Sequence, residues 1–128
     1  SKHSNAMAIT VMSFGFKYGI PADADIVLDV RCLPNPHYIQ ELRPLTGCDE
    51  RVSSYVFSFE ESNGLLARYN EMIDYALPLY VREGKSSLVI AFGCTGGHHR
   101  SVSFAERAGN RLKENDESVL ILHRDYQR

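Results

Sequence analysis

The chain has 128 residues, a formal net charge of −2 and a hydrophobic content of 44%. This length suffices for one compact domain with its own core and leaves no room for two. The slight acidic excess excludes a global basic field that would recruit nucleic acid, so any RNA contact would use a local patch.

No apolar stretch reaches the length of a membrane span, and no secretory signal pattern opens the chain. The three cysteines are an odd number without metal-type spacing, which is typical of a reducing compartment rather than a disulfide framework. We therefore expect a cytoplasmic protein with no membrane partner. Ser4-Asn5-Ala6 ahead of Met7 resembles a scar left by tag removal, so residues 1–6 are set apart and the domain is taken as 7–128.

The first half of the chain predicts two strands and little regular helix. Apolar runs at 9–14 and 25–30 are typical of buried strands, and each is followed by a loop rich in breakers. A short helix is predicted to start near Pro36, capped by the preceding asparagine, and to end before Pro44 or Gly47. Residues 49–59 are ambiguous, and a short helix or turn is favoured there.

The second half alternates helices with strands. Apolar residues recur at helical spacing over 60–82, and Pro78 is expected to kink this helix or end it one turn early. The pattern then predicts a buried strand at 87–92, a helix at 102–113 and a last strand at 118–122. This alternation indicates the α/β class. We expect a single three-layer domain with a small, largely parallel central sheet of about four strands flanked by helices.

Cationic and polar side chains follow the predicted strands. In parallel α/β sheets, ligands bind outside the carboxyl ends of the strands. The loops there would gather Lys17, Arg31, His37, His98, His99, Arg100, His123 and Arg124 at one edge. The walls of a polar pocket at this edge are predicted to include Lys17, Tyr18, Arg31, His123 and Arg124.

Residues 93–101 carry the strongest functional signal. They join a predicted strand to a predicted helix, where a glycine-rich turn points several backbone N–H groups at one spot beside the positive end of the helix dipole. Gly96 and Gly97 let a ligand approach closely, and Arg100 offers a planar fork for phosphate or carboxylate. The glycines could instead only turn the chain, but an arginine is unfavourable at a helix N-terminus without a nearby anion. The loop therefore predicts an anion site, for phosphate first.

Six segments follow one another in a recognisable order: SFGFKYG at 13–19, DVR at 29–31, LPNPHY at 33–38, ELRPLTG at 41–47, GCTGGHHRSV at 93–102 and HRD at 123–125. Together they closely resemble the C-terminal domain of the RapZ family of RNase adapter proteins. The resemblance covers nearly the whole chain from Ile9.

The resemblance implies a domain that senses glucosamine-6-phosphate, binds small regulatory RNA and presents it to a ribonuclease, without catalysis and without a cofactor. The family's sugar-phosphate pocket maps onto Asn35, His37, Thr95, Gly96, His99 and Arg100. With the rest of the loop, the expected ligand-binding set is Asn35, His37, Cys94, Thr95, Gly96, Gly97, His98, His99, Arg100 and Ser101. Full-length relatives self-associate, so a homo-oligomer is expected.

The chain departs from the family pattern in two places. Full-length members carry an N-terminal nucleotide-binding domain with a Gly-x-x-x-x-Gly-Lys-Ser/Thr loop, and this sequence contains no such motif. The chain is therefore either an excised domain or a standalone relative, and nucleotide binding is not carried over. Members also end in a basic tail that helps hold RNA, whereas Arg128 is the only charged residue after Asp125 here. The pocket therefore transfers more directly than the RNA role.

The spacing Cys94-x5-Arg100-Ser101 also matches cysteine-dependent phosphatases. In those enzymes the loop and its arginine hold phosphate while a thiolate attacks phosphorus, and a general acid protonates the leaving oxygen. Asp29 or Asp125 could supply that proton only if the fold places one within reach. Cys94 could equally be a small buried residue at the end of a strand. Catalysis by Cys94 and Arg100 is kept as the alternative to binding alone.

No metal site is expected from the sequence. His98 and His99 are adjacent, so their side chains diverge and chelate one ion poorly. A zinc site that included His37 or His123 would lack a supporting cysteine or carboxylate spacing. Cys32 and Cys48 are interpreted as core or surface residues without a role.

Overall fold

A computed structural model of the protein describes residues 7–116 and 118–128. Its centre is one four-stranded sheet in the order β2-β3-β1-β4, and every pairing between neighbouring strands is parallel. The strands are β1 (Ala8–Gly15), β2 (Ile26–Asp29), β3 (Ser87–Cys94) and β4 (Val119–His123). The expected α/β class and parallel sheet are confirmed. The proposed scar at residues 1–6 lies outside the described residues.

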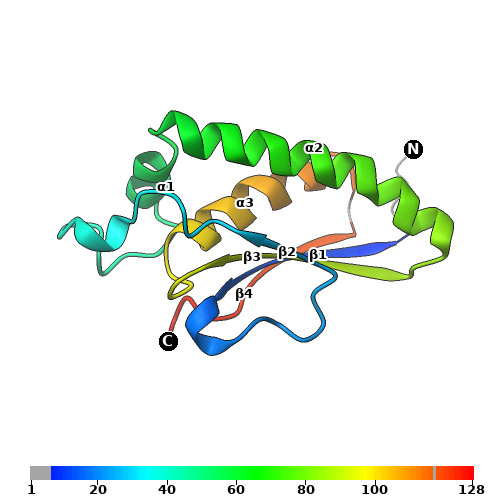
Figure 1. The fold of residues 1–128 in the computed structure, drawn as a ribbon, viewed down its shortest axis with the longest axis horizontal. Coiled ribbons are helices and arrows are strands. Elements are labelled where there is room, and N and C mark those ends of the chain that lie inside the picture. The colour runs from blue at the N-terminus through cyan, green and yellow to red at the C-terminus, as the bar shows by residue number, and fades with distance from the viewer. Residues whose placement is uncertain (1–6, 117) are drawn as a thin grey trace.

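The α-helices cover one face of this sheet (Figure 1). They are α1 (Glu50–Val56), α2 (Glu60–Glu83) and α3 (Arg100–Lys113), with single 3-10 turns η1 (Phe16–Tyr18) and η2 (Pro36–Tyr38). The opposite face carries a smaller cluster, in which Phe16 and Ala24 pack on Met12, Phe14 and Ala91. The third layer is therefore a loop with one helical turn, where the sequence analysis expected flanking helices.

The connection between β2 and α1 contains less helix than predicted. Only Pro36–Tyr38 forms a helical turn, and the chain continues through further turns to α1. The asparagine cap is confirmed, since the Asn35 side chain accepts a hydrogen bond of 3.0 Å from the His37 N–H. The short helix favoured within 49–59 is confirmed as well, and Asp49 caps it.

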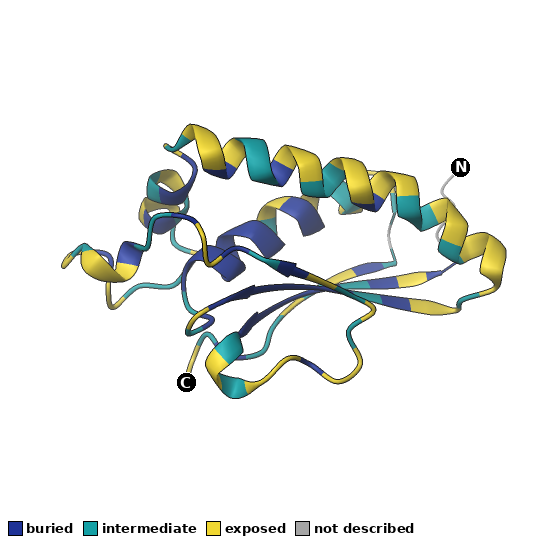
Figure 2. Ribbon diagram, in the orientation of Figure 1, coloured by how far each residue is buried: buried dark blue, intermediate teal, exposed yellow. Residues whose placement is uncertain are grey.

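Pro78 does not end α2 early. The helix continues through it to Glu83 and stops at Gly84, whose φ of +94° gives a left-handed cap. Leu66 and Ile73 face the core, and Figure 2 shows exposed residues along the outer side of the same helix. Burial of this apolar face holds the helix together across the proline. None of the helices in the described part of the chain is long and apolar enough to cross a bilayer.

Helix α3 lies between α2 and the sheet and is the most buried helix in Figure 2. It approaches the sheet closely at Gly109, where an added Cβ would lie 2.5 Å from the Ile121 side chain. Its first turn follows directly from the carboxyl end of β3, through residues 95–99. The fold thus places the start of α3 beside η1 and η2, at the edge where the predicted pocket belongs.

Candidate anion-binding site

A polar pocket of about 270 Å³ opens at the carboxyl ends of the strands. Its lining consists of Lys17, Asn35, His37, Tyr38, Cys94, Thr95, Gly96, His98, His99 and Arg100. The loop after β3, the loop after β2 and η1 therefore meet around one cavity. Eight of the ten residues predicted to bind a ligand line it, whereas Gly97 and Ser101 support it from behind.

The loop between β3 and α3 is held in place by hydrogen bonds between its carbonyl groups and the backbone of two other segments. The Lys17 N–H donates to the Thr95 carbonyl at 3.2 Å, and the Gly47 N–H donates to the His98 carbonyl at 2.8 Å. Gly97 has a φ of +80°, a conformation that side chains other than glycine rarely adopt. The loop is therefore fixed from two sides before any ligand binds.

Arg100 is the central cation of the pocket, with only 4% of its surface exposed. Its Nη1 donates to the carbonyls of Arg31 at 2.8 Å and Leu33 at 2.9 Å. Its Nη2 lies 3.4 Å from the Thr95 hydroxyl, and its buried Nε has no hydrogen-bond partner among the described residues. Leaving a buried charged donor unpaired is costly. One edge of the guanidinium thus holds the β2 loop, and the Nε–Nη2 edge is left for an anion.

The two histidines differ in their surroundings. His99 is buried, and its Nε2 lies 3.2 Å from the Arg43 carbonyl, to which it donates. Burial lowers the pKa of His99, against an opposing contribution from its backbone hydrogen bonds, so this ring is neutral near pH 7. His98 is half-buried, with its Nε2 3.1 Å from the Arg128 carbonyl. His99 therefore adds no positive charge at neutral pH to a pocket that is also lined by the basic residues Arg100 and Lys17.

Cys94 and Ser101 form a buried pair below the loop. The Cys94 Sγ lies 3.1 Å from the Ser101 Oγ, and 3% of Cys94 is exposed. Cys94 still borders the pocket, but neither Asp29 nor Asp125 does. Among the described residues that line this cavity, none is a carboxylate. The aspartate that the phosphatase alternative requires as proton donor is thus not among the described residues that line the pocket.

Four of the five residues predicted as pocket walls lie elsewhere, and Lys17 alone lines the cavity. Arg31 is held by the Asp29 carboxylate and lies 3.8 Å from the centre of the Phe16 ring. Arg124 donates to Asp125 and to a loop carbonyl. His123 ends β4, at the edge of the sheet beside β1, and its ring contacts Ser13 and Glu106 instead of lining the cavity. Tyr18 is absent from the lining as well.

Two residues of the site escaped the sequence analysis. Tyr38 lines the pocket and is 77% exposed, so its ring stands at the mouth. The only feature of the sequence that could have predicted Tyr38 as a lining residue is its position directly after His37. Asp125 was considered as an acid only, yet it is fully buried behind the loop and accepts from the Gly15 N–H at 2.8 Å. Burial alone would raise the pKa of Asp125, but hydrogen bonds from Arg124 and Gly15 outweigh it and lower that pKa.

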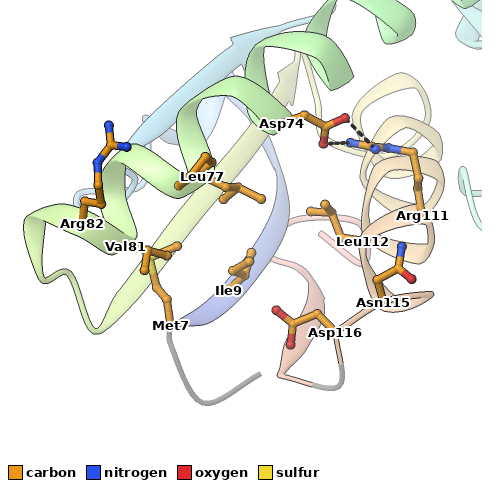
Figure 3. Close-up of a pocket in the computed structure, with 11 residues that line it drawn as sticks. Met7, Ile9, Asp74, Leu77, Val81, Arg82, Arg111, Leu112, Asn115 and Asp116 are labelled. Carbon is orange, nitrogen blue, oxygen red and sulfur yellow. Dashed lines mark hydrogen bonds and ion pairs between the residues drawn. The ribbon is translucent and has the colours of Figure 1, made fainter. Parts of the chain in front are cut away.

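A second, larger hollow of about 630 Å³ lies at the other end of the sheet (Figure 3). Its walls are mainly apolar and include Leu77, Val81 and Leu112. At its rim Asp74 already pairs with Arg111 at 2.9 Å. The lining of this hollow is mainly apolar and includes the carboxylates of Asp74 and Asp116, so the smaller polar pocket is the better candidate for a phosphate-type site.

The chain was compared with known proteins. Residues 7–127 match the family model described as the RapZ C-terminal domain. Similar curated proteins include a nucleotide-binding protein of Bacillus cytotoxicus, 58% identical over 96% of this chain and 42% of its own length. Another, from Caldanaerobacter subterraneus, is 57% identical over 97% of this chain and 44% of its own length. The chain therefore spans less than half the length of these relatives, and it belongs to the RapZ C-terminal domain family.

Proposed function

We propose that this domain binds a phosphorylated sugar of the glucosamine-6-phosphate type in the polar pocket and senses it without chemical turnover. The observation that carries the proposal is the buried Arg100 guanidinium, whose Nε has no partner among the described residues. A phosphate oxygen pair is the natural acceptor for such an edge, because it satisfies both nitrogens at once.

The pocket offers different chemistry to the two ends of this ligand. The phosphate would lie against the Arg100 edge, the Thr95 hydroxyl and the backbone at the start of α3, where the helix dipole favours negative charge. Asn35 and His37, from the loop after β2, also line the pocket and carry polar groups suited to sugar hydroxyls. The supporting features are the polarity of the lining and the absence of any competing carboxylate among its described residues.

The wider adapter role rests on the family to which the chain belongs. We propose that the domain contacts small regulatory RNA and presents it to a ribonuclease, as a homo-oligomer. The chain is slightly acidic, so RNA contact would depend on local cations such as Arg43 and Arg128, both of which are exposed. Several copies in one assembly would combine weak patches into useful affinity.

The first test is a thermal-shift titration with phosphate, sulfate and glucosamine-6-phosphate. A ligand that binds only the folded state stabilises it by about 2.7 kcal/mol at 100 times its Kd, which raises Tm by roughly 10 °C for a domain of this size. We expect the phosphosugar to give the largest shift. Arg100→Gln and Thr95→Val should reduce this shift, and Arg31→Gln should retain it because the Arg31 side chain is held by Asp29 outside the pocket.

The readout is the change in Tm on adding ligand, not the Tm of the free protein. Arg100 also holds the loop after β2, so its substitution lowers the Tm even without ligand. Thr95→Val keeps the contact of Arg100 with the loop after β2, so it tests ligand binding without that loss of stability. Equal shifts in wild type and Thr95→Val, together with an unchanged shift in Arg100→Gln, would remove the site from this pocket. No shift with any of the three anions would refute the binding proposal.

The phosphatase alternative keeps one supporting observation, namely that Cys94 borders the pocket at the spacing such enzymes use. Turnover of an aryl phosphate, measured in wild type and in Cys94→Ser, decides between the two functions. We expect no turnover above background in either protein. Turnover that is lost in Cys94→Ser would make the domain a phosphatase.

A further inference from the structure

Three metal-binding side chains from distant parts of the sequence meet outside the anion pocket. The Cys48 Sγ lies 3.9 Å from the Glu106 Oε2, and the same oxygen lies 2.7 Å from the His123 Nε2. All three donor atoms lie within 4.8 Å of one another. Cys48 and Glu106 border a separate hollow of about 370 Å³, which shares no lining residue with the anion pocket.

Each of the three groups is positioned by contacts of its own. Cys48 is exposed, but the Gly47 beside it is fixed against α3, where the Ser103 hydroxyl donates to the Gly47 carbonyl at 2.8 Å. An added Cβ at Gly47 would overlap the His99 carbonyl, so this turn packs tightly against the start of α3. The thiol is therefore held over the face of α3 that carries Glu106.

His123 is oriented from the opposite side. It pairs with Ser13 across β4 and β1, and the Ser13 hydroxyl lies 2.7 Å from the His123 Nδ1. Its side chain is nearly buried, 7% exposed, so the ring has little freedom to turn. A histidine that binds a metal through one nitrogen needs a hydrogen-bond partner for the other, and Ser13 provides it.

We infer that Cys48, Glu106 and His123 bind a zinc ion, with a fourth position open to solvent on the side of the hollow. Sulfur, nitrogen and carboxylate donors together suit Zn²⁺, whereas Mg²⁺ and Ca²⁺ require oxygen ligands. Tetrahedral zinc at its usual bond lengths places donor atoms about 3.3–3.7 Å apart. The observed separations of 2.7 and 3.9 Å lie on either side of this range, so the Glu106 carboxylate would have to shift when zinc binds.

Binding would displace protons in a defined way. Cys48 loses its thiol proton to water and binds as the thiolate. In the metal-free protein a proton lies between the His123 Nε2 and the Glu106 carboxylate, and zinc binding releases it to solvent. The bound ring carries one proton on Nδ1, taken up from solvent where it is not already there, which donates to the Ser13 Oγ, and the Nε2 lone pair binds the ion. Glu106 exchanges its hydrogen bond with His123 for a bond to zinc. No metal site was expected from the sequence, and these three residues are too far apart in the chain to form a spacing motif.

The experiment is a metal titration of the reduced protein with Zn²⁺ alone, read by calorimetry and equilibrium dialysis. A parallel titration with Co²⁺ reads the ligands directly, since a thiolate ligand gives a charge-transfer band in the near-ultraviolet. We expect one Zn²⁺ per chain and a cobalt spectrum with that band. Cys48→Ser should remove the band and weaken zinc binding by more than about 10-fold, the loss caused even by outer-shell changes. Cys32→Ser is the matched control and should leave both unchanged, because Cys32 is an exposed cysteine outside the group.

Three further variants test the other two ligands and the partner of the histidine ring. His123→Gln should weaken zinc binding as Cys48→Ser does, and Glu106→Gln serves in its place if the His123 variant fails to fold. Ser13→Ala should weaken binding by about 10-fold while the cobalt band remains, because it removes only the partner of the ring. Zinc binding that is equally tight in Cys48→Ser, or no saturable binding at all, would overturn the assignment. A band lost in Cys32→Ser but kept in Cys48→Ser would overturn it as well.

Discussion

At Gly97 the loop between β3 and α3 passes directly behind the end of β1. A Cβ added there would lie 2.6 Å from the Gly15 nitrogen and 3.0 Å from the Asp125 Cβ, and the φ of +80° is itself strained for any other residue. The left-handed conformation costs about 1–2 kcal/mol and overpacking about 1–3 kcal/mol more. We expect Gly97→Ala to lower the free energy of unfolding by roughly 2–4 kcal/mol, measured by urea denaturation.

Two other glycines separate these contributions. Gly84 has a φ of +94° and open space around it, so Gly84→Ala should cost only the conformational part. Gly96 meets nothing nearer than the His98 ring at 3.9 Å and has no positive φ, so Gly96→Ala should change stability little. The expected order of destabilisation is Gly97, Gly84, Gly96. A Gly97 variant no less stable than the Gly84 variant would contradict the close approach of loop and strand.

At the scale of elements, local sequence patterns identified which segments form strands and helices, but not where those elements end. The apolar runs at 9–14 and 87–92 identified β1 and β3, because buried parallel strands are apolar on both faces. The prediction for Pro78 was wrong where it ended the helix early, since the buried face of α2 outweighs a lost hydrogen bond. Such packing comes from residues distant in sequence, so no local pattern contains it.

Pro78 therefore lowers the stability of α2. It lacks the N–H that would bond the Asp74 carbonyl, and a proline within a helix is unfavourable by about 3 kcal/mol relative to alanine. We expect Pro78→Ala to raise the free energy of unfolding by roughly 1–3 kcal/mol, because it restores the hydrogen bond and removes the clash of the ring. The gain stays below the full cost of the proline because the smaller alanine side chain packs less well in the apolar hollow. Urea denaturation of the variant checks this, and a destabilised variant would show that the proline ring is needed for packing there.

At the scale of the whole molecule, the site depended on knowing which loops meet. The order β2-β3-β1-β4 brings the loops after β1, β2 and β3 around one cavity, and strand patterns alone do not give that order. The resemblance to a family supplied Asn35 and His37, which now line the pocket. It included His123 in a matching segment but gave that residue no role, and its neighbours Ser13 and Glu106 come from β1 and α3. Proximity across the fold is the part that the sequence could not provide.

Asp125 joins three of these distant segments. Its carboxylate accepts from the Gly15 N–H at the end of β1, from Arg124 beside it, and from the Arg128 side chain at 2.9 Å. Its Cβ also lies against the position where Gly97 turns. A single fully buried charge thus fixes the C-terminal segment, the strand end and the anion loop together.

The pH dependence of stability follows from this arrangement. Because the folded protein lowers the pKa of Asp125 below the unfolded value of about 3.9, its contribution is complete above that value and is lost as pH falls through the lower, folded pKa. Asp125→Asn should cost roughly 1.5–3 kcal/mol at pH 7, the range for hydrogen bonds to a charged group. Urea denaturation of both proteins at pH 7, 5, 4 and 3 should show a constant difference down to about pH 5 that shrinks below pH 4. A difference that grows on acidification would mean that the neutral acid, and not the carboxylate, holds these segments together.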